Sequence, residues 1–262
     1  MTEKEYRSNP AISRSDLWKL KSTSPEKFKY EMDNPSKPTQ ALAFGQLFHT
    51  MVLEPEKLYD EYVATSYGRK TKKFAEIQEN NPDKTVVTDE EVALATKMRE
   101  SVFNNKKARN LLKGEHEKEF FWRDDFTGVD CKCRTDVFKP RSDGKTCYIA
   151  DLKSAADASP EQFMRDAYKR GYHFQAAYYG EGVKKVTGLK PIFMFLVVEK
   201  EPPYAVAIYR ATEDFVLAGQ DNERFLLSLY KHCKENDDWF GYNGVKDEVL
   251  DLDVPYWASE NV

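Results

Sequence analysis

Two aspartates and one lysine in the middle of the sequence could together carry out metal-assisted chemistry. Asp136 falls on one expected strand, and the triplet Asp151-Leu152-Lys153 falls on the next. Because side chains alternate between the two faces of a strand, Asp151 and Lys153 point the same way. Two carboxylates can bind a hard cation that activates water, and a lysine can orient that water or stabilise negative charge. These residues fit phosphodiester hydrolysis. Asp-x-Lys alone is a common chance spacing, so the surrounding residues must show whether the triplet belongs to a functional site.

Three further polar residues extend this candidate site. Lys132 and Arg134 share strand parity with Asp136, so all three side chains are expected on one face of the strand. Charges at three alternating positions are unusual for a strand with a buried face, and they indicate a polar cleft whose cations could contact a substrate. His49 lies in an apolar helical pattern, where a histidine is more often a hydrogen-bonded core residue than a ligand.

Two residues of an expected helix and one of an expected strand are also candidates. Gln175 and Tyr179, at positions i and i+4, share one helical face. An ordinary amphipathic helix has the same spacing, so this pair alone does not separate a supporting role at the site from a structural one. Glu119 lies on the strand before Asp136, where an alternating surface charge is the simpler interpretation.

The order of helical and strand patterns predicts a mixed sheet flanked by helices, of the α/β or α+β class. Two capping boxes, Ser13 with Asp16 and Thr88 with Glu91, mark helix starts, and Gly171 interrupts a later helix. Turn-rich segments separate three strands of an antiparallel meander, and a proline turn joins a later hairpin. The expected helices are 13–20, 24–30, 40–53, 88–104, a short one to 112, 159–170, 172–185 and 213–235; the expected strands are 117–123, 128–138, 146–152, 192–199 and 204–210; residues 67–84 are expected to be a mobile loop with at most one helical turn.

Composition limits the class of protein. The 262 residues are 40% hydrophobic, enough for a sizeable core, and 40 Lys and Arg against 44 Asp and Glu give a formal net charge of −4. This balance argues against general nonspecific affinity for nucleic acid, so any DNA-facing surface must be local. The basic runs 69–73 and 106–109 are candidates, and solvated surface charge explains them equally well.

The sequence shows no secretory h-region, no apolar run of membrane-spanning length and no Gly-x-x-x-x-Gly-Lys-Ser/Thr phosphate loop. Its four cysteines, at positions 131, 133, 147 and 233, form neither a disulfide framework nor a zinc spacing. We therefore expect a cytoplasmic protein with reduced structural thiols and no nucleotide cofactor.

Several segments, in a fixed order, resemble a known family. They are Phe44 to His49, Lys132 to Asp136, Asp151 to Lys153, and Gln175 to Tyr179. Together they are similar to the PD-(D/E)XK nuclease superfamily, and most similar to its RecE-type branch, the catalytic domain of exonuclease VIII. The two ends of the chain also resemble such nucleases, so the resemblance covers residues 12–258. A threonine replaces the proline of the family's name, which leaves the metal ligands unchanged.

The resemblance implies a restriction-endonuclease-like fold, with a mixed central sheet, flanking helices and a helical N-terminal segment. The whole of residues 1–262 would form one nuclease domain. Within it, residues 12–116 would be mainly helical, 117–211 would form the core sheet and helix, and 212–262 would be a C-terminal helix and tail.

The resemblance also assigns roles at the site. His49, Asp136 and Asp151, with the main-chain carbonyl of Leu152, would bind Mg²⁺ or Mn²⁺, and Lys153 would be the catalytic lysine. The family's helix motif, which supports the site and the scissile strand, matches Gln175 and Tyr179. A further acidic position of the family matches Glu119.

On this resemblance we expect a Mg²⁺-dependent deoxyribonuclease, most simply a 5′→3′ exonuclease on double-stranded DNA ends in phage or prophage recombination. It would act in the cytoplasm of a bacterial or phage-infected cell beside a single-strand annealing protein, as a homo-oligomeric ring of the kind that encloses DNA. One alternative is a RecB-like endonuclease or exonuclease, whose iron–sulfur version the cysteine spacing disfavours. Another is a catalytically silent DNA-binding module, which the intact Asp136, Asp151, Lys153 and His49 disfavour.

Overall fold

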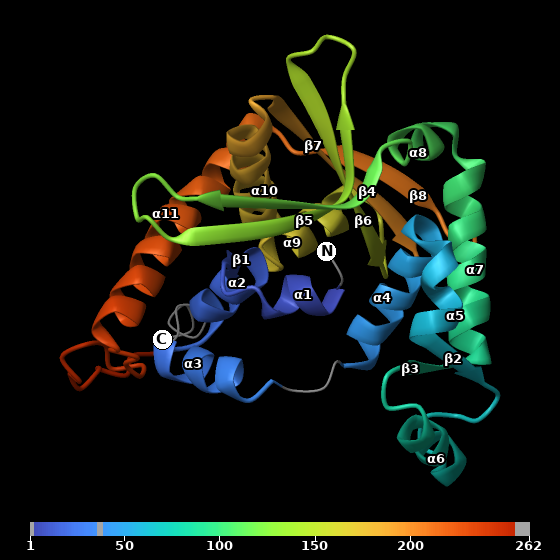
Figure 1. The fold of residues 1–262 in the computed structure, drawn as a ribbon, viewed down its shortest axis with the longest axis horizontal. Helices are drawn as coiled ribbons and strands as arrows, with labels where there is room; N and C mark the ends of the chain where they lie inside the picture. The colour runs from blue at the N-terminus through green and yellow to red at the C-terminus, as the bar shows by residue number, and fades with distance from the viewer. Residues whose placement is uncertain (1–2, 36–38, 255–262) are drawn as a thin grey trace.

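A six-stranded mixed sheet forms the centre of the molecule. The computed structural model describes residues 3–35 and 39–254, and Figure 1 shows their arrangement. The strand order is β1-β5-β6-β7-β8, with β4 also paired to β5; β1–β5 and β6–β7 are parallel and the other pairs are antiparallel. The strands of this sheet are β1 (Ile12–Ser13), β4 (Glu115–Arg123), β5 (Asp130–Pro140), β6 (Thr146–Ala155), β7 (Lys190–Glu199) and β8 (Val206–Arg210).

Helices cover both faces of the sheet (Figure 1), which confirms the predicted class. On one face, Leu47 of α4 and Met98 of α7 belong to the same core cluster as Leu152 and Leu196 of the sheet. On the other, α2, α3, α9, α10 and α11 enclose an aromatic-rich core that includes Tyr178. The helices are α1 (Glu3–Ser8), α2 (Arg14–Ser22), α3 (Pro25–Asp33), α4 (Gln40–Leu53), η1 (Pro55–Lys57), α5 (Leu58–Glu61), α6 (Lys72–Asn80), α7 (Asp89–Asn104), α8 (Lys106–Leu111), α9 (Pro160–Lys169), α10 (Tyr172–Thr187) and α11 (Glu213–Asn236).

The ladder between β5 and β6 is short, and its end creates a fork in the sheet. The ladder stops at the pair Val137 and Ala150. Beyond that pair, β6 stays bonded to β7 over its whole length, whereas the same edge of β5 next pairs with the two-residue strand β1. Asp136 and Asp151 directly follow the last pair, one on each side of the fork.

A second, two-stranded parallel sheet stands at the periphery with α6 beside it (Figure 1). Its strands are β2 (Tyr62–Thr65) and β3 (Thr85–Thr88). The prediction that residues 67–84 form a loop with one helical turn is wrong, because α6 is nine residues long. Thr71 caps it by accepting from the Phe74 amide, and the buried Phe74 ring anchors it. A single apolar anchor in a polar segment gives too weak a periodic signal to predict such a helix.

Other local signals are confirmed. Both predicted capping boxes form, with Ser13 and Thr88 as the N-caps of α2 and α7. Gly171 separates α9 from α10 with φ +69°, a left-handed conformation that favours glycine. The predicted meander corresponds to β4–β5–β6 and the predicted hairpin to β7–β8. Within the described part of the chain, no helix combines the length and apolarity needed to cross a membrane.

Candidate active site

At the fork, a side chain of β5 bonds to the backbone of β6, where no backbone pair connects the two strands. The Oδ2 atom of Asp136 accepts a hydrogen bond of 2.6 Å from the main-chain amide of Leu152. This bond satisfies a backbone donor at the point where the β5–β6 ladder has ended. The Asp136 side chain remains 13% exposed, so the carboxylate lies at the mouth of the fork.

His49 reaches the same point from α4. Its Nε2 atom lies 2.6 Å from the carbonyl oxygen of Leu152, and its Nδ1 atom lies 3.5 Å from Oδ2 of Asp136. The ring can donate from Nε2 to the carbonyl, which leaves Nδ1 available for a second proton or a metal ion beside the carboxylate. The apolar helix therefore positions one polar group at the fork. The predicted neighbours His49, Asp136 and the Leu152 carbonyl are together in the structure.

Asp151 lies deeper in the fork and is 2% exposed. Its Oδ1 atom accepts a hydrogen bond of 2.5 Å from Nε2 of Gln175 on α10. Its buried Oδ2 atom makes an ion pair of 2.6 Å with Lys153 but no hydrogen bond. Burial raises the pKa of this carboxyl, Lys153 opposes the rise, and Asp136 adds to it. Two nearby carboxylates that have lost their water disfavour each other's charge, and a bound cation would relieve this repulsion.

The ammonium group of Lys153 is fixed by two neighbouring side chains. It contacts Asp151 and also lies 4.8 Å from the ring centroid of Tyr172. Burial opposes its charge, but Asp151, Tyr172 and Asp136 outweigh burial, so the pKa of Lys153 is raised. The lysine therefore carries a positive charge in this arrangement and suits charge stabilisation better than proton abstraction.

Glu117 is a site residue that sequence reasoning missed. Ligand atoms of His49, Glu117 and Asp136 all lie within 4.8 Å of one another. Glu117 stands opposite Asp136 on β4, where the ladder lacks a pair, and its φ is +47°. A non-glycine residue in this region is strained and is often found at functional sites. The sequence offers three glutamates of one strand parity here, at 115, 117 and 119, and only the cross-strand register selects among them.

These donors fit a divalent cation. Three carboxylates and one imidazole lie around the fork, and the oxygen-rich set suits Mg²⁺ or Mn²⁺, with the imidazole favouring the second. The residues that would hold the ion are His49, Glu117, Asp136 and Asp151. In the structure Asp151 is turned toward Gln175 and Lys153, outside the close group formed by the other three.

The two cations predicted to contact a substrate are engaged by protein groups. The Lys132 ammonium is buried and donates to the carbonyl oxygens of Tyr6 and Asn9 at 2.8 and 2.7 Å, so it fixes the C-terminal end of α1 and the residue that follows it. Arg134 makes an ion pair of 2.8 Å with Glu117. Arg134 thus contacts a member of the carboxylate group, whereas Lys132 supports the scaffold. Their contact with a substrate stays a prediction.

Two further residues predicted for the site, Tyr179 and Glu119, lie on α10 and on β4. Tyr179 lies one helical turn after Gln175 and is partly buried. Burial first, then negative neighbours that include Asp151, raise the pKa of its phenol well above the ordinary value, so the hydroxyl stays protonated. Glu119 pairs with Arg134 across the β4–β5 ladder and is not a member of the close metal-ligating group.

A forked mixed sheet with an aspartate on one arm and an Asp-x-Lys triplet on the other defines the restriction-endonuclease-like fold of the PD-(D/E)XK nuclease superfamily. Residues 13–248 match the family described as "PDDEXK-like domain of unknown function (DUF3799)". The chain therefore belongs to this family.

Comparison with solved structures supports the fold. A protein from Eubacterium rectale, described as a "putative exonuclease", aligns over 99% of this chain and 97% of its own, with a TM-score of 0.65 and 14% identity. A structure named SSO0001 aligns over 85% of this chain and 81% of its own, with 14% identity and a TM-score of 0.38, and carries no argument. No curated protein matches the sequence.

Proposed function

We propose that the protein is a Mg²⁺- or Mn²⁺-dependent deoxyribonuclease. The observation that supports this proposal most strongly is the fork, where Asp136 and His49 lie beside the buried ion pair of Asp151 and Lys153. A buried, partly satisfied charge network contributes little to stability, and strongly perturbed groups of this kind cluster at catalytic sites. Membership of the PDDEXK-like family points to the same chemistry.

Each residue of the fork has a distinct task in this proposal. The cation, when bound, would supply an activated water and neutralise charge on the scissile phosphate. Lys153, kept positively charged by Asp151, orients the attacking water or stabilises the phosphate oxygens. Gln175 fixes Oδ1 of Asp151, so that Oδ2 and the lysine keep their relative positions.

A cationic hollow beside the fork supports contact with a phosphate backbone. Tyr172 joins the hollow to the site, because its ring lies against Lys153. One terminal nitrogen of Arg14 donates to the carbonyls of residues 170 and 171, which holds the guanidinium in place at the hollow. The hollow has a volume of about 560 Å³ and is lined by Arg14, Trp18, Asp166, Lys169, Arg170 and Tyr172.

The finer proposal is a 5′→3′ exonuclease of the RecE type that acts on double-stranded DNA ends during phage or prophage recombination. Its supports are the ordered motifs of the sequence and the likeness in fold to a protein described as a "putative exonuclease". A single-strand annealing protein as partner, and a ring of identical subunits that holds the DNA, belong to the same proposal.

The proposal is tested by incubating the purified protein with linear duplex labelled at either 5′ end, in Mg²⁺, in Mn²⁺ or in EDTA, beside closed circular DNA. We expect metal-dependent loss of label from linear duplex only, and none with Asp151→Ala. Equal degradation by the wild-type protein and Asp151→Ala would refute the proposed site. Cleavage of closed circles would favour an endonuclease on the same fold.

Two other functions are less well supported. A RecB-like nuclease with an iron–sulfur cluster would need cysteine ligands, but the four cysteines are buried and none belongs to a metal-ligating group within residues 3–35 and 39–254. Burial raises the pKa of Cys131 to about 12 and that of Cys147 to about 11, which disfavours thiolate ligands. A silent DNA-binding module on the same fold would show binding with no turnover in the assay above.

A further inference from the structure

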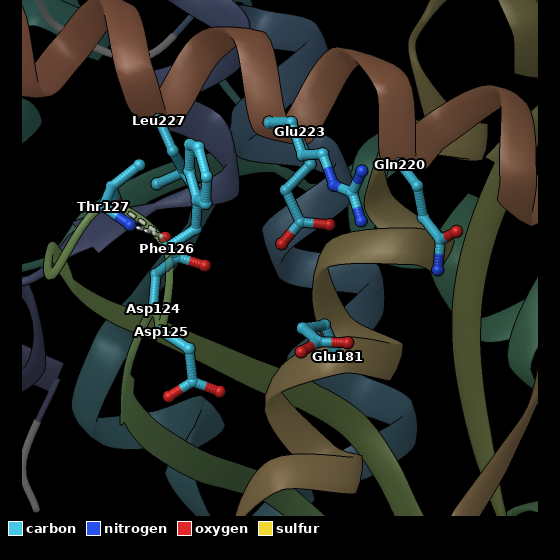
Figure 2. Close-up of a pocket in the computed structure, with 9 residues that line it drawn as sticks. Asp124, Asp125, Phe126, Thr127, Glu181, Gln220, Glu223 and Leu227 are labelled. Atoms are coloured by element: carbon cyan, nitrogen blue, oxygen red, sulfur yellow. Dashed lines mark hydrogen bonds between the residues drawn. The ribbon is translucent and has the colours of Figure 1, made fainter.

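A second polar cavity lies away from the fork, between the β4–β5 turn and helices α10 and α11. Figure 2 shows carboxylates from the turn, from α10 and from α11 around it. The cavity has a volume of about 230 Å³. It is lined by Asp124, Asp125, Phe126, Thr127, Glu181, Gln220, Glu223, Arg224 and Leu227.

Glu223 is the unusual member of this cavity. It is 6% exposed, and within the described residues its carboxylate has neither a hydrogen bond nor an ion pair. In Figure 2 the carboxylate points from α11 into the cavity, toward Glu181. A buried carboxylate without a partner is destabilising, so natural proteins pair it or use it.

Two of the other acidic residues at the cavity already bond to protein groups. Asp124 accepts from the amide and hydroxyl of Thr127 at 2.7 and 2.5 Å, which fixes the turn. Asp125 makes an ion pair of 2.7 Å with Lys185. Glu181 and, once it has given up its proton, Glu223 therefore supply the negative charge that a cation in the open space would meet.

An aromatic ring stands at the same cavity. Phe126 lies in the turn, is 84% exposed and lines the cavity, so its ring is accessible to a ligand. A ring face beside carboxylates is the arrangement that recognises organic cations, through cation–π contact and charge-assisted hydrogen bonds.

A metal ion fits this cavity poorly. Among the described residues, no three of these carboxylates offer oxygen atoms within 4.8 Å of one another, whereas ligand atoms of His49, Glu117 and Asp136 at the fork do lie that close. Dispersed carboxylates around a volume of this size instead suit a larger cation that carries several donors.

We propose that this cavity binds an organic cation, an alkylammonium or guanidinium group, with Glu223 as its counter-ion, Glu181 as a second acceptor and Phe126 as its aromatic contact. The group could come from a free polyamine or from a lysine or arginine side chain of a protein partner, since both present the same chemistry. The proposal does not depend on the nuclease proposal, because the cavity and the fork share no residue.

Arg224 of the chain itself is the group that would compete with an external cation for Glu223. It lines the cavity, and it lowers the pKa of Glu223 by less than burial, Glu181 or Asp124 each raise it. If Arg224 were the resident cation, its replacement by alanine would open the site and strengthen external binding many-fold. We expect Arg224→Ala to change that binding less than threefold.

The test uses the full chain without DNA and three probes: N-acetyl-arginine amide, the uncharged isostere N-acetyl-citrulline amide, and putrescine. Binding is measured by calorimetry, and amide NMR shifts locate it on the turn and on α11. We expect at least one cation to bind about tenfold more tightly than the citrulline compound. Tighter binding of putrescine assigns a free amine as the source, and tighter binding of the arginine compound assigns a protein side chain.

Three variants make the result decisive. Glu223→Gln should weaken cation binding about tenfold, because it removes the counter-ion. Phe126→Ala, at a position that is 84% exposed and outside the packed core, should weaken it several-fold. Asp221→Asn makes the same change of charge at an exposed position of α11 outside the cavity and should have no effect. Equal binding of the citrulline compound, or undiminished binding to Glu223→Gln, would overturn the proposal.

Discussion

The buried Glu223 should make the stability of the free protein depend on pH in a way that one substitution removes. Burial, followed by the negative charges of Glu181 and Asp124, raises the pKa of Glu223 from 4.5 to about 8. In the unfolded chain the carboxyl loses its proton near pH 4.5, whereas in the folded chain it keeps the proton until about pH 8. The contribution of this group to folding therefore falls as pH rises from 4.5 to 8, and it is fully unfavourable above pH 8.

The size of the effect follows from the same pKa values. A difference of about 3.5 between folded and unfolded pKa corresponds to about 5 kcal/mol, at about 1.4 kcal/mol for each pKa unit. Because the carboxylate faces a cavity that admits water, we expect about half of this, roughly 2–3 kcal/mol. A neutral amide of the same shape escapes the penalty. Glu223→Gln should therefore gain little stability at pH 4.5 and about 2–3 kcal/mol at pH 8.5.

Urea unfolding of the wild-type chain and Glu223→Gln, followed by circular dichroism at pH 5, 6, 7, 8 and 9 in amine-free buffer, measures this difference. Asp221→Asn serves as the control, since its exposed side chain should leave the difference from wild type unchanged with pH. A gap between the wild-type chain and Glu223→Gln that stays constant from pH 5 to 9 would refute the argument. It would mean that the carboxylate is hydrated and titrates normally.

Three further predictions concern the fork and the packing behind it. Glu117→Gln should weaken Mn²⁺ binding about tenfold, as measured by titration of the paramagnetic signal of the ion, whereas Glu119→Gln should leave the affinity unchanged. Weaker binding by Glu119→Gln and unchanged binding by Glu117→Gln would show that Glu119 is the ligand. Gln175→Leu should lower turnover about 10- to 100-fold with little change in melting temperature, because it releases Asp151 Oδ1; an unchanged rate would remove Gln175 from the site. Gly219→Ala should lower the free energy of unfolding in urea by about 1–3 kcal/mol, because the added Cβ would lie 2.9 Å from the Ala177 side chain and closer still to the His173 carbonyl. An unaltered urea midpoint would show that α10 and α11 can move apart.

Much of the fold could be predicted because its signals are local. The meander and the hairpin follow from apolar alternation between turn residues, and the capping boxes identify where α2 and α7 begin. The Asp151 and Lys153 pair follows from strand alternation alone. The placement of α6 could not be predicted, because one buried side chain, Phe74, carries all of its packing signal.

The remaining parts of the site depend on register and tertiary approach. Nothing in the sequence states that the β5–β6 ladder ends at Ala150, yet this ending opens the fork and gives Asp136 an amide to bind. Glu117 joins the site only because it stands opposite Asp136 with a left-handed backbone. Lys132 satisfies the parity rule for a cleft residue, yet its ammonium group binds carbonyl oxygens at the end of α1 and just after it.

The central claim is that Lys153 beside Asp151 acts in metal-assisted hydrolysis at the fork. Its most direct test compares turnover of linear duplex DNA in saturating Mg²⁺ by the wild-type chain and by Lys153→Met, with Mn²⁺ affinity measured on the same samples. We predict that Lys153→Met keeps Mn²⁺ affinity within about threefold and loses at least about 100-fold in turnover, since one cation is removed from the developing charge. Wild-type turnover by Lys153→Met would contradict the claim.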